Sequence, residues 1–245
     1  MWSLILSLCF VASAEIYDNN SMKMEDMEKI KTLLIAKKPL TWIFTGDSIT
    51  HGALHTYGWR SFSEHFSERI RFEMGRGLDY VINTGISGNS TSEVLQSFER
   101  RVSQLKPDVV FLMIGTNDSV AGMDGVNTYE SNLSKLVDLI RQSDAIPVLN
   151  TPNPILSEVG TGGANRACLS EYVRVMRKVA EQKNIILIDH WKHWETIKPG
   201  KDSMMEWLAD SIHPNLYGHI EIAKEIFKAL EIYDTNSPTC KLFVP

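Results

Sequence analysis

Short apolar segments alternate with amphipathic segments along most of this chain, and this alternation restricts the fold more than any other feature of the sequence. The apolar segments have the length of buried strands and span residues 40–44, 80–83, 108–114, 146–150 and 185–188. The intervening segments carry apolar residues at helical spacing and span residues 22–36, 59–72, 91–101, 128–141 and 166–181. Strands that alternate with helices predict an α/β fold in which right-handed crossovers connect a parallel sheet.

Polar blocks that contain glycine directly follow the first three predicted strands. The blocks are Gly46-Asp47-Ser48, Gly85-Ile86-Ser87-Gly88 and Gly115-Thr116-Asn117. In an open parallel sheet, ligands bind beyond the carboxyl ends of the strands. We therefore expect the three blocks to lie on one rim of the sheet and to share a site.

Ser48, Asp210 and His213 have the chemistry of an activated serine nucleophile and occur in that order along the chain. His213 is predicted to be the general base toward Ser48 and the general acid toward the leaving alcohol, while Asp210 orients the imidazole. Pro214 suits the first turn of a helix that continues to Leu230, so Asp210 and His213 are expected on a loop at its entrance. Taken alone, each block has a simpler interpretation, namely a polar turn around Ser48 and a capping Asp beside a surface His.

A developing oxyanion requires hydrogen-bond donors, which a glycine amide and an asparagine side chain can supply. Asn117 is the predicted side-chain donor, although an Asn after a strand also often bonds to its own backbone. Gly85 and Gly88 both qualify as the backbone donor, and their residue types alone do not distinguish them.

These blocks resemble those of the SGNH hydrolases, also called GDSL esterases or lipases, over about residues 41–218. The four residues that give the family its name correspond to Ser48, Gly88, Asn117 and His213. The resemblance implies a three-layer α/β/α, flavodoxin-like fold and hydrolysis through an acyl-enzyme. It also implies an oxyanion hole formed by the amides of Ser48 and Gly88 and the side chain of Asn117. The Gly-x-Ser-x-Gly motif of the α/β-hydrolase nucleophile elbow is absent around Ser48, which argues against that unrelated fold.

The predicted substrate is a small acyl ester, such as an acetyl ester, on a carbohydrate or similar polyol. The segment 46–60 resembles that of a bacterial branch of the family that is linked to short acyl groups on carbohydrates. The candidate substrate-binding residues are Asp47, Trp59, Arg60 and Asn89. Two alternatives remain: a lysophospholipase or thioesterase with the same machinery, and a non-catalytic glycan-binding protein on the same fold.

No metal or other cofactor is predicted, and the expected partner is a small-molecule or glycan ester. His51 and His55 are four residues apart, but no glutamate lies between them in the metalloprotease pattern. A net charge of −5 provides no basic footprint for nucleic acid. Cys168 and Cys240 lack metal-ligand spacing, and both a disulfide and two free thiols are compatible with the sequence.

The N-terminal residues predict export. Residues 4–11 are apolar, and Ala12-Ser13-Ala14 fits a small-residue cleavage site, so residues 1–14 are predicted to be a signal peptide. This segment is too short to span a membrane as a helix. Residues 15–245 are then one SGNH hydrolase domain in a secreted or periplasmic protein, or in a cytoplasmic one if the leader is not a signal. The sequence predicts no oligomeric state.

Overall fold

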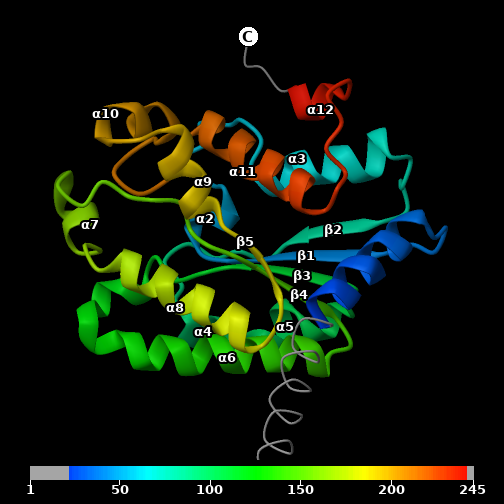
Figure 1. The fold of residues 1–245 in the computed structure, drawn as a ribbon, viewed down its shortest axis with the longest axis horizontal. Helices are drawn as coiled ribbons and strands as arrows, with labels where there is room; N and C mark the ends of the chain where they lie inside the picture. The colour runs from blue at the N-terminus through cyan, green and yellow to red at the C-terminus, as the bar shows by residue number, and fades with distance from the viewer. Residues whose placement is uncertain (1–21, 242–245) are drawn as a thin grey trace, which may run out of the picture.

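A parallel sheet forms the centre of the molecule in the computed structural model, which describes residues 22–241 (Figure 1). The sheet has 5 strands in the order β2-β1-β3-β4-β5, and every neighbouring pair is parallel. The strands are β1 (Thr41–Gly46), β2 (Tyr80–Asn83), β3 (Val109–Met113), β4 (Ile146–Asn150) and β5 (Ile186–Ile188). Because β2, β1 and β3 are neighbours, the loops after their carboxyl ends lie side by side.

Helices cover both faces of the sheet and complete the predicted α/β/α sandwich. Figure 1 shows α3 (Phe62–Ser67) and α11 (Leu216–Ala229) above the sheet. Below it lie α4 (Thr91–Gln96), α6 (Val126–Gln142) and α8 (Leu169–Gln182). Apart from the helix of residues 22–35, the remaining helical elements are α2 (Ser48–His51), η1 (Glu68–Glu73), α5 (Phe98–Arg101), η2 (Ser103–Leu105), η3 (Asp118–Gly125), α7 (Gly160–Ala164), α9 (His190–Ile197), α10 (Lys201–Met204), η4 (Met205–Trp207) and α12 (Pro238–Lys241).

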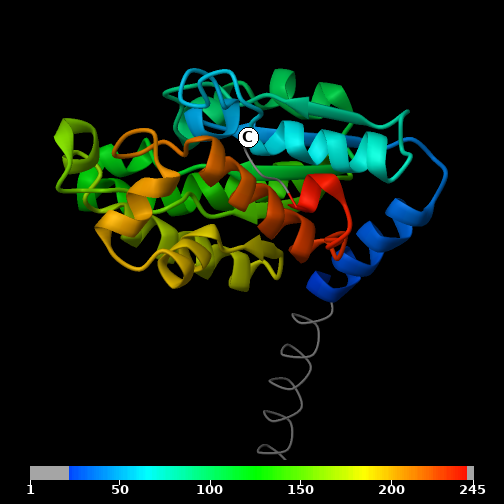
Figure 2. The ribbon, with the colours of Figure 1, turned by 90° about the horizontal axis from the view of Figure 1, so that it is seen from above.

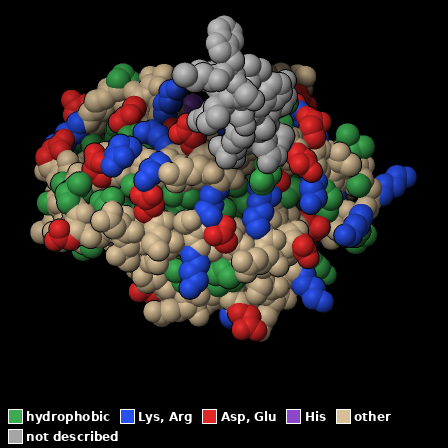
Figure 3. Space-filling model, turned by 60° about the horizontal axis from the view of Figure 1, so that its bottom comes forward, with side chains coloured by type: hydrophobic (Ala, Val, Ile, Leu, Met, Phe, Trp, Pro, Cys, Tyr) green, Lys and Arg blue, Asp and Glu red, His purple; other side chains and the backbone are tan. Residues whose placement is uncertain are grey.

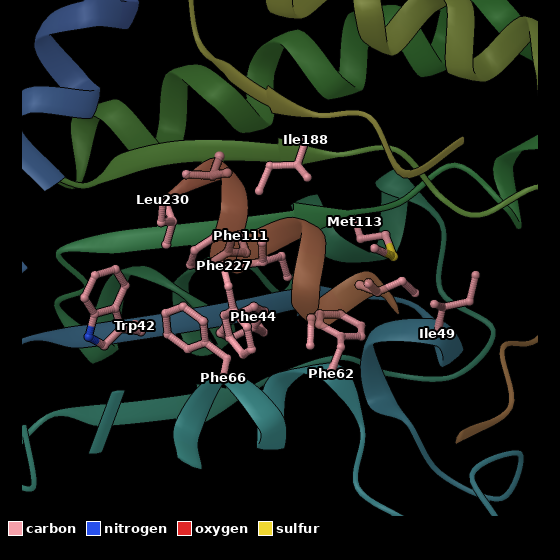
Figure 4. Packing of buried hydrophobic residues seen from close by; sticks show 14 of the residues in the cluster. Trp42, Phe44, Ile49, Phe62, Phe66, Phe111, Met113, Ile188, Phe227 and Leu230 are labelled. Carbon is pink, nitrogen blue, oxygen red and sulfur yellow. The ribbon is translucent and has the colours of Figure 1, made fainter. Parts of the chain in front are cut away.

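Alternate residues of the buried strands face the two helical layers, because successive side chains of a strand point to opposite sides. In β1, Trp42 and Phe44 enter the core beneath α3 and α11, whereas Ile43 enters the core on the opposite face. Figure 4 shows the first of these cores, in which the ring of Phe44 stacks on that of Phe111 with 4.5 Å between centroids. Burial on both faces explains why the strands are continuously apolar.

Several helix boundaries differ from those predicted. The segment 59–72 becomes helical only at Phe62, because Ser61 and Glu64 form a capping box, and it continues as a π-helix to Glu73. The predicted helix 91–101 is interrupted at Ser97, which separates α4 from α5. The elements α9, α10 and η4 were not predicted, because each is too short to give a clear period.

The helix of residues 22–35 lies at one end of the sandwich and is the dark blue helix at the right of Figure 2. Its Ile30 is fully buried in the core beneath α3 and α11. Its Asp26 accepts hydrogen bonds from Arg141 of α6 at 2.8 and 2.5 Å. These contacts connect the helix to both helical layers.

Within residues 22–241, no helix is both long enough and apolar enough to cross a membrane. The face shown in Figure 3 carries basic and acidic side chains interspersed with one another. The predicted signal peptide, residues 1–14, lies outside the described residues.

Candidate active site

Ser48 lies directly beyond the carboxyl end of β1, at the first position of the short helix α2. Gly46 permits the tight exit from the strand, because a Cβ at this position would lie 2.0 Å from the carbonyl oxygen of Met113 on β3. Asp47 caps α2 by accepting a hydrogen bond from the amide of Ile49 at 2.9 Å. The serine hydroxyl is thereby held at the rim of the sheet.

Asp210 and His213 lie on the loop before α11, as predicted, and the fold brings them to Ser48. His213 Nε2 is 2.9 Å from Ser48 Oγ, and His213 Nδ1 is 2.8 Å from Asp210 Oδ2. The other carboxylate oxygen, Asp210 Oδ1, accepts the backbone amides of Ile212 and His213, each at 2.7 Å. The side chains therefore form a continuous hydrogen-bonded chain in which the carboxylate is fixed by its own loop.

The electrostatic environment of this chain suits a neutral base beside an ionised carboxylate. Burial acts to raise the pKa of Asp210, but hydrogen bonds from the amides of His213 and Ile212 and from the imidazole outweigh it, so the pKa lies below its ordinary value. Burial lowers the pKa of His213, and Asp210 only partly opposes this effect. His213 is accordingly neutral at pH 7 and able to accept a proton.

The structure distinguishes the two candidate glycines. A Cβ at Gly85 would lie 2.6 Å from the amide nitrogen of His51, so Gly85 permits close packing against α2. Gly88 has a φ of 84° and open space around it, and it occupies the third position of a turn closed by the amide of Asn89 and the carbonyl of Ile86 at 3.2 Å. This φ is the one that the third residue of a type II turn requires.

Two backbone amides and one side-chain amide are available as hydrogen-bond donors at the rim of the sheet. Within residues 22–241, the amides of Ser48 and Gly88 donate to no protein acceptor. Asn117 Nδ2 donates one hydrogen to the carbonyl of Asn89 at 2.9 Å, which leaves its second hydrogen free. This set of donors corresponds to the oxyanion hole that the resemblance implied.

Arg166 determines which way the Asn117 amide faces. Its Nη2 donates to Asn117 Oδ1 at 2.8 Å, so the oxygen end of the amide is occupied and the nitrogen end is turned toward Asn89. The guanidinium itself is anchored on the carbonyls of Thr116 and Gly162 at 3.0 and 2.9 Å. This contact was not predicted from the sequence, because 49 residues separate the two side chains.

Arg101, at the end of α5, connects the loops that surround the site. The guanidinium donates to the carbonyl of Thr84 at 3.0 Å, to Asn89 Oδ1 at 2.9 Å and to the carbonyl of Gly46 at 2.8 Å. Arg101 is almost completely buried and was also missed by the sequence analysis. One cation thus joins the ends of β1 and β2 to the turn that contains Gly88.

The predicted substrate-binding residues occupy different environments. Asp47 is completely buried, so the expectation that it contacts substrate is corrected: its carboxylate caps α2 instead. The side chain of Asn89 is engaged by Arg101. Arg60 forms an ion pair with Glu68 at 3.2 Å, whereas Trp59 is 46% exposed. Of the four, Trp59 and Arg60 are exposed, and Trp59 is the one with a flat aromatic surface.

Two further tryptophans and the two cysteines of the described residues do not contribute to the site. Trp194 is fully buried and Trp191 is nearly so, so both belong to the core. Cys168 and Cys240 are both free thiols, so the alternative of a disulfide between them is not realised.

His55, which the sequence paired with His51, lies against the catalytic loop instead. His51 Nδ1 is 3.0 Å from Ser87 Oγ, whereas His55 Nε2 is 3.3 Å from Asp210 Oδ2. The potential ligand atoms of His55, Asp210 and His213 lie within 4.8 Å of one another. The two imidazole planes are only 4° from parallel, so their in-plane lone pairs do not converge on one point as a shared metal ion requires.

A family model described as "GDSL-like Lipase/Acylhydrolase family" matches residues 44–219, which is more than half of the chain. The chain belongs to this family. The acetylxylan esterase of Geobacillus stearothermophilus is 27% identical over 210 residues, covering 77% of this chain and 92% of that protein. The multidomain esterase of Ruminococcus flavefaciens is 28% identical over 228 residues, and an uncharacterized protein of Mycoplasma pneumoniae is 38% identical over 108 residues.

The aligned regions are 28% of the Ruminococcus esterase and 12% of the Mycoplasma protein, so the chain spans only a small part of these two relatives. Among solved structures, an alpha/beta hydrolase enzyme from the metagenome of Lake Arreo, Spain, superposes with a TM-score of 0.66 at 26% identity, covering 81% of this chain and 99% of that chain. The acetylxylan esterase Axe2 of Geobacillus stearothermophilus gives a TM-score of 0.63 at 24% identity, covering 78% and 94%. The family model confirms the predicted family, and these superpositions confirm the predicted fold.

Proposed function

We propose that this protein is a serine esterase that hydrolyses acetyl esters on carbohydrates through an acyl-enzyme. The observation that carries the proposal is the hydrogen-bonded chain from Ser48 Oγ through His213 to Asp210, with contacts of 2.9 and 2.8 Å, beside three free amide donors. A serine hydroxyl, a neutral imidazole and an ionised carboxylate in this order are the parts of a nucleophile–base system.

In the proposed first step, Ser48 Oγ attacks the ester carbonyl carbon while His213 Nε2 takes the hydroxyl proton. The negative charge that develops on the carbonyl oxygen is stabilised by the amides of Ser48 and Gly88 and by Asn117 Nδ2. The tetrahedral intermediate then collapses, and the imidazolium returns the proton to the leaving alcohol. In the second half, water repeats the attack on the acyl-serine and releases the carboxylic acid.

Exposed aromatic side chains next to this site support a carbohydrate as the alcohol. Tyr57 is 71% exposed and Trp59 is 46% exposed, and both lie on the loop whose His55 contacts Asp210. Flat aromatic faces with polar neighbours are suited to packing against sugar rings. A relative named acetylxylan esterase gives the acetyl group and the glycan additional support, and a relative named multidomain esterase supports ester hydrolysis.

Labelling with a fluorophosphonate tests the nucleophile. The wild-type protein should be labelled stoichiometrically at Ser48, and Ser48→Ala should not react. Labelling should coincide with faster hydrolysis of p-nitrophenyl acetate than of p-nitrophenyl decanoate. A preference for the decanoate would favour the lysophospholipase or thioesterase alternative, and a folded wild-type protein that is not labelled would favour a non-catalytic glycan-binding protein.

Substitution of Trp59 tests the carbohydrate. Trp59→Ala should raise KM for an acetylated xylo-oligosaccharide and leave KM for p-nitrophenyl acetate unchanged, because only the sugar reaches the loop. The matched control is Tyr80→Ala, since Tyr80 is 68% exposed but begins β2 at the opposite end of the sheet. An equal effect of Trp59→Ala on both substrates would contradict a role in sugar binding.

The same proposal extends to residues 1–14 as a cleaved signal peptide and to residues 15–245 as one exported domain. Its support is the apolar segment followed by Ala12-Ser13-Ala14. A relative in Bacillus subtilis, 26% identical over 178 residues, is described as an uncharacterized lipoprotein. Mass spectrometry of protein recovered outside the cytoplasm should find Glu15 as the first residue, and an intact Met1 would contradict cleavage.

A further inference from the structure

The segment that follows β4 contacts the catalytic loop, which carries Asp210 and His213. Residues 151–154 are all buried, and their sequence is Thr-Pro-Asn-Pro. The two prolines have a fixed φ, and Asn153 is biased toward extended backbone because Pro154 follows it. Asn153 therefore lies on a stiff piece of main chain, and its side chain is completely buried.

Two hydrogen bonds join this segment to the catalytic loop. Asn153 Nδ2 donates to the carbonyl of Ile212 at 3.0 Å. The amide of Leu156 donates to the carbonyl of Ser211 at 2.9 Å. The second hydrogen of Asn153 Nδ2 goes to the carbonyl of Pro154 at 2.8 Å. Both neighbours of this nitrogen are carbonyl oxygens, which only accept, so the nitrogen end of the amide must face them.

The contact with Ile212 fixes the second end of one peptide group. The amide of His213 donates to Asp210 Oδ1 at 2.7 Å. The carbonyl of the same peptide group, that of Ile212, accepts from Asn153. A peptide group is planar, so hydrogen bonds at both of its ends set the orientation of the whole plane. The Cα of His213 belongs to that plane, and the direction in which the imidazole leaves the backbone therefore depends on the Asn153 contact.

The oxygen end of the Asn153 amide indicates that the residue does more than fill space. Within residues 22–241, Asn153 Oδ1 is buried and has no hydrogen-bond partner. Buried polar atoms are normally paired, because an unpaired one lowers stability. An apolar side chain of the same size would avoid this cost, but it would offer no donor to the Ile212 carbonyl.

We propose that Asn153 is a positioning residue of the esterase, which holds the peptide group before His213 so that the imidazole stays aligned between Ser48 and Asp210. This inference rests on the proposed function. Without the Nδ2 donor, the carbonyl of Ile212 loses its partner in a buried position and turns away to find another. The peptide plane rotates with it, which weakens the hydrogen bond from the His213 amide to Asp210 and moves Nε2 out of line with Ser48 Oγ.

The rest of the catalytic loop keeps its contacts when this donor is lost. The hydrogen bond between Leu156 and Ser211 remains, and so does the backbone bridge between Leu208 and Pro214. Loss of the donor should therefore loosen the imidazole without detaching the loop. An imidazole out of line slows the proton transfers of the reaction, so the effect should appear in kcat rather than in KM.

Asn153→Leu tests the proposal, because leucine has nearly the same size and no donor. Its kcat on p-nitrophenyl acetate should fall about tenfold with little change in KM. The downfield NMR resonance of the His213 Nδ1 proton reports the hydrogen bond to Asp210, and it should shift upfield or broaden in the variant. Asn150→Leu is the matched control, since Asn150 is also buried but forms its hydrogen bonds within β4 and to α9. The control should lose stability and keep the wild-type kcat and resonance.

Asn153→Asp is a second variant, which keeps the shape of the native side chain. The introduced carboxyl offers one O–H donor when it is protonated and none when it is ionised. Its kcat relative to the wild type at the same pH should therefore be lower at about pH 8 than at about pH 5. If Asn153→Leu does not fold, this comparison decides, and a relative kcat that is equal at both pH values overturns the need for a donor.

A folded Asn153→Leu variant with the wild-type kcat or with an unshifted resonance would overturn the inference. An equal loss of kcat in Asn150→Leu would also overturn it, because the loss would then follow from destabilisation alone. Fluorophosphonate labelling separates this inference from the proposed function, since it reports activation of Ser48 whichever ester is the natural substrate. A folded wild type that is not labelled refutes the esterase itself. A labelled wild type, together with an Asn153→Leu variant that is labelled at the same rate, refutes the role of Asn153 alone.

Discussion

Asn117 is held at both ends of its side-chain amide, which leaves a single hydrogen to serve as a donor. Asn89 accepts from Nδ2 and Arg166 donates to Oδ1. At the residue scale, this arrangement makes Asn117 a fixed donor rather than a turn residue that bonds to its own backbone. The competing interpretation from the sequence is therefore not the one that the structure adopts.

Asn117→Ala should fold normally and lose about two decades in kcat, because one oxyanion donor contributes roughly 3 kcal/mol to the transition state. Rates on p-nitrophenyl acetate, together with a thermal melt, provide the measurement. A variant with full activity would show that the oxyanion is stabilised elsewhere.

At a pH where His213 is neutral, Arg166 should act on the reaction through Asn117. Arg166→Met should lower kcat about tenfold in the wild-type background and have little further effect in the Asn117→Ala background, since coupled residues are not additive. A double-mutant cycle on kcat measures this coupling. An equal effect in both backgrounds would mean that Arg166 acts independently of Asn117, for example on the substrate. Arg174→Met is the control, because Arg174 is an exposed arginine.

At the scale of elements, the site depends on how strand ends are connected. The carboxyl ends of β1 and β2 and the turn with Gly88 are joined by the buried guanidinium of Arg101, although α5 itself contributes no residue to the catalytic chain. An element of four residues thus determines the relative placement of three loops.

Arg101→Met should lower the free energy of unfolding by about 3 kcal/mol, because three oxygen acceptors lose their donor in a buried position. It should also reduce fluorophosphonate labelling at temperatures where the protein is still folded. Denaturant titrations measure the first effect. Arg100→Met is the adjacent control, since Arg100 is exposed, and a similar loss in both variants would contradict the role of Arg101.

The elements themselves were largely predictable. All five strands appear within a residue or two of their predicted positions, because a continuous apolar segment is a local signal. Helix boundaries were less predictable where a cap or an interruption intervenes. Ser61 delays α3 and Ser97 divides α4 from α5, and neither effect follows from apolar spacing alone.

At the scale of the whole molecule, the fold buries a carboxyl group next to the nucleophile. Asp47 is completely buried, and this burial raises its pKa to about 7. Between its ordinary value of 3.8 and about 7, the native protein retains a proton that the unfolded chain releases. The free energy of unfolding therefore declines as the pH rises through this interval.

Asp47→Asn should remove this dependence, because the amide does not titrate and its Oδ1 still accepts the hydrogen bond from Ile49. The Tm of the variant relative to the wild type should rise steadily between about pH 4 and pH 8. Thermal melts of both proteins at a series of pH values measure this difference in Tm. A Tm difference that is constant or that falls with pH would mean that Asp47 is ionised throughout this interval.

The sequence by itself determined the strands, the parallel α/β architecture and the candidates Ser48, Asn117, Asp210 and His213, because these signals lie in short segments. It left Gly85 and Gly88 both open as the backbone donor, and only the family resemblance favoured Gly88. Only the tertiary structure decided that Gly85 serves packing, that Asp47 is buried, that Arg101 bonds to the loops around the site and that Arg166 bonds to the Asn117 side chain. Ser48 and His213 are 165 residues apart, and the supporting contacts also join different elements. Such contacts depend on strand order and on the directions of side chains, which no local pattern in the chain encodes.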